Sequence, residues 1–506
     1  MAKRTAIIDI GSNSARLVIF EKTSRYGFHL LCEQKSKVRI GEGAYEKKGY
    51  LQPAAIKRAY LALRSFLETI DKYQAHKTIC VATSALRDAP NGALFVKWVK
   101  KELGLHIKII DGETEARLGA IAAKNLLPIE SAITIDIGGG SSDLSLIING
   151  RIVESHSLDL GTVRLKELFY DKADSPKQSY SLATEYVRKT LRSLPLSFQS
   201  TVAVGIGGTA RALSKGIMKK SAYPFDKLHA FGYRPKEYKA YLHAIPLSSA
   251  KGLKAFGLKK GRFDTIREGT LIWNEILAHI GAKEVITSSV GVREGVFLSH
   301  LLKDDHYRFP ASINPSIVSI LDRFKPQINL EKKKKVKLAL AKKLFEVLPH
   351  NVSELYLPVL LKALTLSNIG KTLTIYKSHQ HAFYIAMQEL NYQFTHEEML
   401  LIASLLRMHG KELLYRPVYE RYKALLPSKE RLRWLSFIYS LSIYLYESSH
   451  AAAISFEYYS QTLHIYSDKS LYLAKESIKA LEKPTPFAII VHDKESIPKN
   501  RLLAIE

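Results

Sequence analysis

Residues 5–20, TAIIDIGSNSARLVIF, decide the expected fold, because residues 132–147, AITIDIGGGSSDLSLI, repeat their pattern. In each copy a β-rich run ends in Asp-Ile-Gly, a turn of small residues follows, and a second β-rich run completes a strand–turn–strand unit. Asp9 in the first copy corresponds to Asp136 in the second. The repeat indicates two related lobes that face a shared cleft.

The two turns favour a phosphate site in that cleft. Their glycines adopt positive φ without steric cost, so successive backbone N–H groups can converge on one anion. The neighbouring Ser and Asn side chains add hydroxyl and amide donors. Either turn alone fits an ordinary hairpin just as well, since Gly, Ser and Asn dominate such turns. The matched pair of acids favours the phosphate site.

The composition limits the class of protein and its partners. A chain of 506 residues is too long for one core and should hold three or four domains. No uninterrupted apolar run reaches the roughly 18 residues of a membrane span, and Asp9 interrupts the N-terminal run, so we expect neither a span nor a signal peptide. Cys32 and Cys80 lie in apolar, strand-like surroundings, which indicates buried thiols and a cytoplasmic protein.

The chain is strongly basic, with 75 Lys and Arg against 48 acids and a net charge of +27. Such a charge attracts polyanions, whether nucleic acid, anionic lipid or a phosphate polymer. Part of it is expected to be a solvated surface. The run at residues 331–335, EKKKK, most simply begins an exposed helix face.

The hydrophobic pattern divides the chain into four expected domains. Strand and helix patterns alternate over residues 1–125 and again over 126–305, which predicts an α/β sheet in each lobe. Residues 314–450 have helical apolar spacing almost throughout. Residues 452–506 return to two strands, a helix and a last strand, a small α/β domain.

Two further segments carry residues suited to phosphate. In residues 205–213, GIGGTARAL, a strand leads into a helix at Gly208 and Thr209, which places free N–H groups and the positive helix end beside the turn. An ordinary strand-to-helix turn capped by Thr209 fits equally well. In residues 81–91, VATSALRDAPN, Arg87 follows a strand in an expected loop. Its guanidinium suits phosphate oxygens, although a structural pair with Asp88 is an alternative.

A helix predicted between the lobes supplies a candidate base. Residues 111–119, DGETEARLG, place Glu113 and Glu115 in its first turn, where acids also favour the helix dipole. Hydrolysis of a phosphoanhydride needs a positioned water, a base to deprotonate it, and cations that offset charge on the transferred group. The chain holds a candidate for each of these parts.

Six motifs in order, DIGSNSARL, ATSALRDA, DGETEARL, DIGGGSSDL, GIGGTARAL and VGVREG, resemble the exopolyphosphatase / guanosine pentaphosphate phosphohydrolase (Ppx/GppA) family. The resemblance covers roughly residues 5–302 and continues more weakly to the C-terminus, as in long members. It implies the two-lobed α/β fold of actin, the sugar kinases and the heat-shock ATPases, which is ribonuclease H-like.

The resemblance also implies roles for individual residues. Glu115 falls on the proposed general base, and Arg87 on a residue that neutralises phosphate oxygens. Asp136 and Asp143 fall on an acidic pair linked with Mg²⁺, although family members often carry Glu at the second position. The expected phosphate contacts are Asp9, Gly11, Ser12, Asn13, Ser14, Arg16, Gly138, Gly139, Gly140, Ser141, Gly208 and Thr209.

The helical domain departs from the long relatives. It resembles His-Asp metal phosphohydrolases, but Ser367 and Asn368 stand where those proteins have a metal-binding His-Asp or His-Glu pair. Neither is a good transition-metal ligand. We therefore expect a degenerate His-Asp-like domain that serves as a scaffold or a polymer-binding surface.

The function that we predict is Mg²⁺-dependent release of terminal phosphate from inorganic polyphosphate. The alternative is conversion of guanosine pentaphosphate (pppGpp) to ppGpp, a stringent-response activity with the same chemistry. An ATP-dependent small-molecule kinase and a non-catalytic polyanion-binding protein fit less well, because DGETEAR supplies a base and the site acids and glycines are intact. We expect a homodimer with no specific nucleic-acid partner.

Overall fold

The computed structural model describes residues 3–44, 48–171, 176–249, 251–325, 331–408, 412–448 and 453–494. The chain forms two compact units. The first is Met1–Ser319 with Asn391–Gln393, and the second is Ile320–Leu390 with Phe394–Glu506. None of the helices in the described residues is long and apolar enough to cross a membrane.

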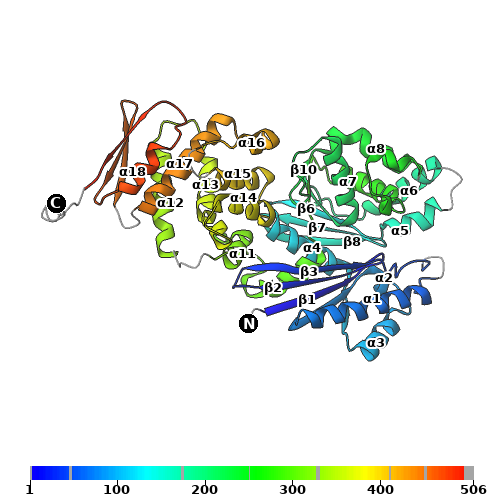
Figure 1. The fold of residues 1–506 in the computed structure, drawn as a ribbon. Helices are drawn as coiled ribbons and strands as arrows, with labels where there is room; N and C mark the ends of the chain where they lie inside the picture. The colour runs from blue at the N-terminus through cyan, green and yellow to red at the C-terminus, as the bar shows by residue number, and fades with distance from the viewer. Residues whose placement is uncertain are drawn as a thin grey trace, which may run out of the picture. The chain divides into compact units, whose positions relative to one another are not determined.

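The first sheet of the first unit has the strand order β3-β2-β1-β4-β5. Strand β1 pairs with β2 antiparallel and with β4 parallel, so the repeat hairpin lies at the centre of the sheet. Helices α1 and α3 cover its outer face (Figure 1). The bounds are β1 Lys3–Ile10, β2 Ala15–Lys22, β3 Phe28–Ser36, α1 Pro53–Lys72, β4 Lys77–Ala82, α2 Ser84–Arg87, α3 Gly92–Leu103 and β5 Ile107–Ile109.

The alternation of side chains along β1 orients the first aspartate. Ala6, Ile8 and Ile10 pack into the core formed with α1 and α3, whereas Ile7 belongs to a different core on the opposite face. Because successive strand residues point to opposite faces, Asp9 shares the face of Ile7. That face is directed toward the second lobe.

The second sheet has the order β10-β11-β9-β6-β7-β8, with the second repeat hairpin, β6–β7, at its centre. Helices α6, α7, α8 and α9 pack on the side away from the first sheet (Figure 1). The bounds are β6 Ala132–Ile137, β7 Ser142–Ile148, β8 Arg151–Leu158, α5 Thr162–Leu165, α6 Pro176–Leu191, β9 Val202–Ile206, α7 Gly207–Lys220, β10 Gly232–Tyr233, α8 Lys239–Leu247, α9 Ile266–His279 and β11 Glu284–Thr287.

Two helices, α4 (Gly112–Leu126) and α10 (Val292–Leu301), separate the sheets. Helix α4 packs on β7 and β8, and α10 packs on both α4 and β1. Ile133, Ile135 and Ile137 of β6 face the outer core, so Asp136 points to the inner face. Both repeat aspartates therefore point into the same layer between the sheets, as two facing lobes require.

The second unit is described by itself. It contains a helical part, a sheet with the order β12-β13-β14, and a helix that packs on α17. The boundary between the two units falls within α11 Pro315–Arg323. The other elements of the second unit are α12 Glu331–Val347, α13 Leu357–Leu366, α14 Ser378–Glu389, α15 His396–Arg407, α16 Arg416–Tyr422, α17 Lys429–Ser448, β12 Ile454–Tyr459, β13 Thr462–Ser467, α18 Tyr472–Lys479 and β14 Ala488–His492.

The predicted fold class, two facing α/β lobes of the actin and sugar-kinase kind followed by helical and small α/β parts, is confirmed. The finer division at residues 125, 305, 314 and 450 remains a prediction. Arg87 does not lie in a loop, as predicted, but ends the short helix α2, because Leu86 and Arg87 donate backbone hydrogen bonds to Thr83. The short helix α5 continues as a π-helical turn at Lys166–Tyr170.

Candidate active site

A cleft of about 180 Å³ lies between the two lobes, where the repeat turns meet. It is lined by residues from both turns, from the start of α7 and α10, and from β2 and β3. Of the residues predicted from sequence, those that line it are Asp9, Gly11, Ser12, Asn13, Ser14, Arg16, Glu115, Asp136, Gly138, Gly139, Ser141, Gly208 and Thr209.

Four carboxyl groups influence one another in this layer, namely Asp9, Glu115, Asp136 and Asp143. Burial raises the pKa of Asp9 to about 6, although Arg293 and Arg16 oppose the rise. Burial also raises the pKa of Glu115 well above its usual value, and the charges of Asp143, Asp136 and Asp9 raise it further. Buried like charges disfavour simultaneous ionisation. The cleft therefore favours a bound proton or cation among its acids.

Glu115 lies in the first turn of α4, which Asp111 caps by accepting a hydrogen bond from the Thr114 N–H. Its Oε2 atom is buried and accepts no hydrogen bond, while Arg87 Nη1 lies 3.6 Å away. Arg87 also donates to the Ile110 carbonyl at 3.1 Å. A buried carboxylate oxygen without a donor is available to accept a proton, as a general base must be.

Asp143 lies beside the cleft but does not line it. It is buried, and Ser157 of β8 donates a hydrogen bond to its Oδ1. Burial raises the pKa of Asp143 despite that bond. Gly112 allows α4 to approach here, because a Cβ on it would lie 2.2 Å from the Ser157 Cβ. Asp143 is thus buried at the junction of α4 with the second sheet, where its charge raises the pKa of Glu115.

The start of α7 brings backbone donors to the cleft. Gly207 has φ +78°, and a Cβ on it would lie 2.1 Å from Asp136 Oδ1. Only glycine fits both this conformation and this contact. The N–H groups of the first turn of a helix have no partner within the helix and attract anions. Gly208 and Thr209 therefore present donors beside the acidic group of the second repeat.

Five cationic side chains surround the anion side of the cleft. They are Arg16, Lys35, Arg211, Arg262 and Arg293. Burial and the neighbouring Arg16 lower the pKa of Arg211 to about 10, and the same causes lower that of Lys35 to about 8. Cations that disfavour one another's charge are stabilised by an anion. The arrangement can hold more than one phosphoryl group.

The two repeat turns touch across the lobes. A Cβ on Gly139 would lie 3.0 Å from the Ser12 Cβ, and Ser12 Oγ lies 3.1 Å from Ser84 Oγ of α2. In each hairpin the glycine N–H bonds to the serine carbonyl three residues later, Gly11 to Ser14 and Gly138 to Ser141. The two turns therefore have the same local geometry and approach each other at the cleft.

The structure brings together most of the predicted residues and adds four cations. Arg87, Gly140 and Asp143 do not line the cleft, and Arg87 contacts Glu115 instead. Sequence reasoning missed Lys35, Arg211, Arg262 and Arg293. Arg211 and Arg293 lie within the quoted motifs GIGGTARAL and VGVREG. Arg211 comes three residues after Gly208 in the first turns of α7, and Arg293 comes two residues after Gly291, the N-cap of α10, and these positions were the available signal.

Mg²⁺ fits these residues only if protein carboxylates and substrate phosphate oxygens hold the ion together. In the described part of the chain no three His, Cys, Asp or Glu side chains converge closely enough to hold a metal by themselves. Mg²⁺ often takes one or two carboxylates and completes its shell with phosphate oxygens and water. The raised pKa values of Asp136 and Asp143, and the Glu115 oxygen that accepts no hydrogen bond, agree with such a site.

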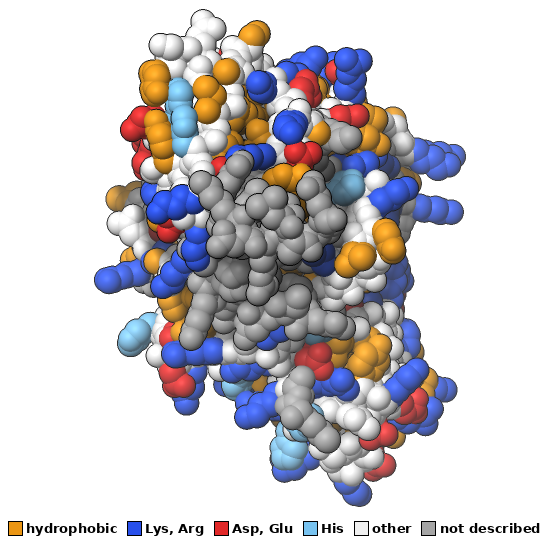
Figure 2. Space-filling view, turned by 60° about the vertical axis from the view of Figure 1, so that its left-hand side comes forward, with side chains coloured by type: hydrophobic (Ala, Val, Ile, Leu, Met, Phe, Trp, Pro, Cys, Tyr) orange, Lys and Arg blue, Asp and Glu red, His pale blue; other side chains and the backbone are white. Residues whose placement is uncertain are grey.

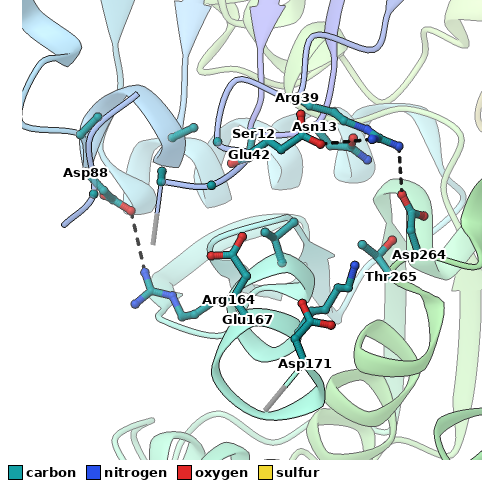
Figure 3. Close-up of a pocket in the computed structure, with 18 of the residues that line it drawn as sticks. Ser12, Asn13, Arg39, Glu42, Asp88, Arg164, Glu167, Asp171, Asp264 and Thr265 are labelled. Atoms are coloured by element: carbon teal, nitrogen blue, oxygen red, sulfur yellow. Dashed lines mark hydrogen bonds and ion pairs between the residues drawn. The ribbon is translucent and has the colours of Figure 1, made fainter. Parts of the chain in front are cut away.

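A larger cavity of about 780 Å³ adjoins the cleft and shares Ser12, Asn13 and Thr265 with it. Two ion pairs cross it from one lobe to the other, Arg39–Asp264 at 3.7 Å and Arg164–Asp88 at 3.8 Å (Figure 3). It lacks the catalytic carboxylates and has six others along its wall: Glu42, Asp88, Asp159, Glu167, Asp171 and Asp264.

Comparison with known proteins agrees with this geometry. The model of the Ppx/GppA phosphatase family matches residues 18–304, more than half of the chain. The chain belongs to this family. The predicted identity as a phosphoanhydride hydrolase is confirmed at the level of the Ppx/GppA family.

Individual Ppx/GppA relatives match the two lobes. Exopolyphosphatase 2 of Mycobacterium tuberculosis is 29% identical over 58% of this chain and 98% of its own length. The bifunctional 3-dehydroquinate synthase/phosphatase of Fusobacterium nucleatum is 31% identical over 56% of this chain, a match that spans only 44% of that relative. The Aquifex aeolicus family member, a crystal structure, is 28% identical with a TM-score of 0.52, over 60% of this chain and all of its own.

The predicted degenerate position in the helical part is already occupied by a cation. The buried Lys337 of α12 donates its ammonium to Ser367 Oγ at 2.5 Å and lies 5.6 Å from the centre of the Tyr446 ring. An ammonium group beside this residue disfavours a metal ion at the same place. The scaffold role that we predicted for this part remains a prediction.

Proposed function

We propose that the chain is an exopolyphosphatase, which hydrolyses the terminal phosphoanhydride bond of inorganic polyphosphate. The observation that carries the proposal is that Glu115 lines a cleft that also holds five cations and the N-terminus of α7. Phosphoryl transfer depends on positioning and charge stabilisation, and this arrangement supplies both. The name of the Mycobacterium relative supports the same substrate.

The chemical step needs only groups of this cleft and one water. The terminal phosphate lies against the Gly11 and Gly138 turns, and Arg211 offsets its charge. Glu115 accepts a proton from the water, whose oxygen forms a bond to the terminal phosphorus. The bond to the bridging oxygen breaks, and its electron pair leaves with the shortened chain. Asp136 and Asp143 would hold Mg²⁺, which offsets negative charge on the phosphates when bound.

A nucleotide substrate is the second candidate, and the larger cavity favours it. The cavity lies next to the phosphate turns, and its volume of about 780 Å³ is within the range of small-molecule sites. The 5′-phosphates of pppGpp would then enter the cleft, and the nucleoside would occupy the cavity. The chemistry at Glu115 would be unchanged.

The test measures phosphate release from long-chain polyphosphate and from pppGpp side by side, with and without Mg²⁺. We expect a kcat/KM at least about tenfold higher for polyphosphate, which corresponds to about 1.4 kcal/mol of transition-state stabilisation. A preference of that size for pppGpp would reverse the two candidates. Homodimerisation and a cytoplasmic location remain predictions from the sequence.

A further inference from the structure

Two pockets adjoin the catalytic cleft, and their charges are opposite. Among the described residues, the larger, acid-lined cavity carries six carboxylates against four cations, which are Arg39, Lys48, Arg164 and Lys166. The second pocket, of about 190 Å³, shares Gly208, Arg211 and Arg262 with the cleft. The described residues that line this basic pocket include five cations and no carboxylate. The five are Arg211, Lys215, Lys219, Lys259 and Arg262.

Three of these cations form a row along α7. Arg211, Lys215 and Lys219 are spaced four residues apart, which places them on one face of the helix. Eight residues of helix span about 12 Å, so the row leads away from the cleft over a distance greater than one phosphoryl group. The row begins at Arg211, which lines both the cleft and the basic pocket.

The ammonium groups of the row remain available to a ligand. Lys215 Nζ lies 3.9 Å from Asp226 Oδ1, but the Asp226 side chain is 91% exposed, and exposed pairs of this kind contribute little. Lys219 Nζ donates to the Gly257 carbonyl at 3.1 Å, an uncharged partner. Neither contact neutralises the positive charge of the pocket.

On the face of the described chain that Figure 2 draws, cations are not gathered in this way. Figure 2 shows Lys and Arg side chains spread over one face, among acidic and apolar ones. In the cleft and basic pocket, by contrast, burial and Arg16 lower the pKa of both Arg211 and Arg262. A polyanion that extended from the cleft would relieve this repulsion.

We propose that a bound linear polyphosphate, with its terminal phosphate in the catalytic cleft, extends out of the cleft through the basic pocket, along the Arg211–Lys215–Lys219 row of α7. It does not extend through the acid-lined cavity. The inference rests on the proposed function. The terminal phosphate occupies the cleft, the next phosphates contact Arg211 and Arg262, and those beyond contact Lys215, Lys219 and Lys259. In the larger cavity carboxylates outnumber cations among the described residues, and Arg39 and Arg164 are already paired with Asp264 and Asp88, so this cavity attracts the same chain less.

The test reverses the charge of the row outside the cleft. In the Lys215→Glu/Lys219→Glu variant we expect the KM for long-chain polyphosphate to rise on the order of tenfold. Tripolyphosphate, which is too short to reach both lysines, should keep its KM within about twofold, and kcat should be unchanged for both substrates. Thermal unfolding verifies the fold. If this variant does not fold, Lys215→Gln/Lys219→Gln replaces it, with an expected rise of about threefold.

Two control variants distinguish an effect of the α7 row from an effect of the overall positive charge. Lys220→Glu changes the exposed residue next to Lys219 on the same helix, and Lys166→Glu changes a cation of the acid-lined cavity. Neither should change the KM for long chains by more than about twofold. If the wild type hydrolyses no polyphosphate, the proposed function is wrong. If it does, and the row variant resembles the wild type or Lys166→Glu has the larger effect, the exit path is wrong.

Discussion

Asp136 and Asp143 occupy directly opposed positions of β6 and β7, where the first hairpin pairs Asp9 with Arg16. Opposed residues of antiparallel strands point to the same face. The aspartate therefore faces an arginine cation in the first hairpin and a second aspartate in the other. The first hairpin is thus neutral at this position, and the second carries an excess of negative charge. The same backbone unit serves the anion in one lobe and favours a cation in the other.

Replacing Asp143 should raise the stability of the protein and lower its activity. Because the pKa of Asp143 is raised in the folded state, its contribution to stability is present at low pH and is lost as the pH rises through that raised pKa. We therefore expect Asp143→Asn to raise the Tm by about 2–4 °C at pH 8 without Mg²⁺ and to leave it unchanged near pH 4. Turnover should fall at least about tenfold.

Calorimetry with and without Mg²⁺ tests this expectation. Mg²⁺ should raise the Tm of the wild type more than that of the variant, because a bound ligand stabilises only the state that binds it. The exposed Asp304 provides a matched control, Asp304→Asn, which should change neither property. An unchanged Tm for Asp143→Asn at pH 8 would contradict the repulsion between the paired acids.

Glu115→Gln should remove most of the catalysis. The amide cannot take a proton from water, and loss of a general base costs about 100- to 10,000-fold in kcat. The KM should change little, because Glu115 lies on the acidic side of the cleft. The control is Glu113→Gln in the same helical turn, where the side chain is exposed. If both variants lose activity equally, Glu115 is not the base.

The pH profile of kcat/KM should have an acidic limb well above the usual range of a glutamate. Burial and the charges of Asp143 and Asp136 raise the pKa of Glu115, and the base acts only when ionised, so activity should rise with pH through that raised value. In Asp143→Asn the repelling charge is gone, and the limb should move to lower pH. A limb that moves upward or stays in place would assign the profile to another group.

Two glycines of positive φ allow strain to be separated from contact. Gly207→Ala would place a methyl group 2.1 Å from Asp136 Oδ1, whereas Gly104→Ala, at φ +64°, has nothing within 4 Å. Both variants should lose about 1 kcal/mol of stability through backbone strain. Only Gly207→Ala should also lose activity, by about tenfold or more, because it displaces Asp136. Chemical denaturation and phosphate release measure the two effects.

The sequence predicted those parts that depend on local pattern. The alternation of Ala6, Ile8 and Ile10 fixes the face of Asp9, and the repeated Asp-Ile-Gly fixes that of Asp136, so the facing lobes followed from period and repetition. The position of Glu115 in the first turn of a helix was predicted from the segment DGETEARLG, and the structure places it in the first turn of α4, which Asp111 caps.

Other parts depend on tertiary contacts that no pattern encodes. Arg211 and Arg262 lie 51 positions apart in sequence numbering and meet only because α9 is preceded by a loop that returns to α7. The depth of Asp143 behind the cleft follows from the approach of α4 to Ser157 of β8, which requires Gly112, whereas its predicted role as a metal ligand stays a prediction. The acid-lined cavity likewise arises only when the lobes are assembled, because its lining residues come from both.

The contact between Gly139 and Ser12 gives the cleft a fixed gauge. Since a methyl group on Gly139 would lie 3.0 Å from the Ser12 Cβ, the contact between the two turns limits the width of the cleft at this point. An opening of this kind limits the width of a substrate but not its length. A chain of identical phosphates could therefore be shortened one unit at a time, each new end meeting the same opening as the last.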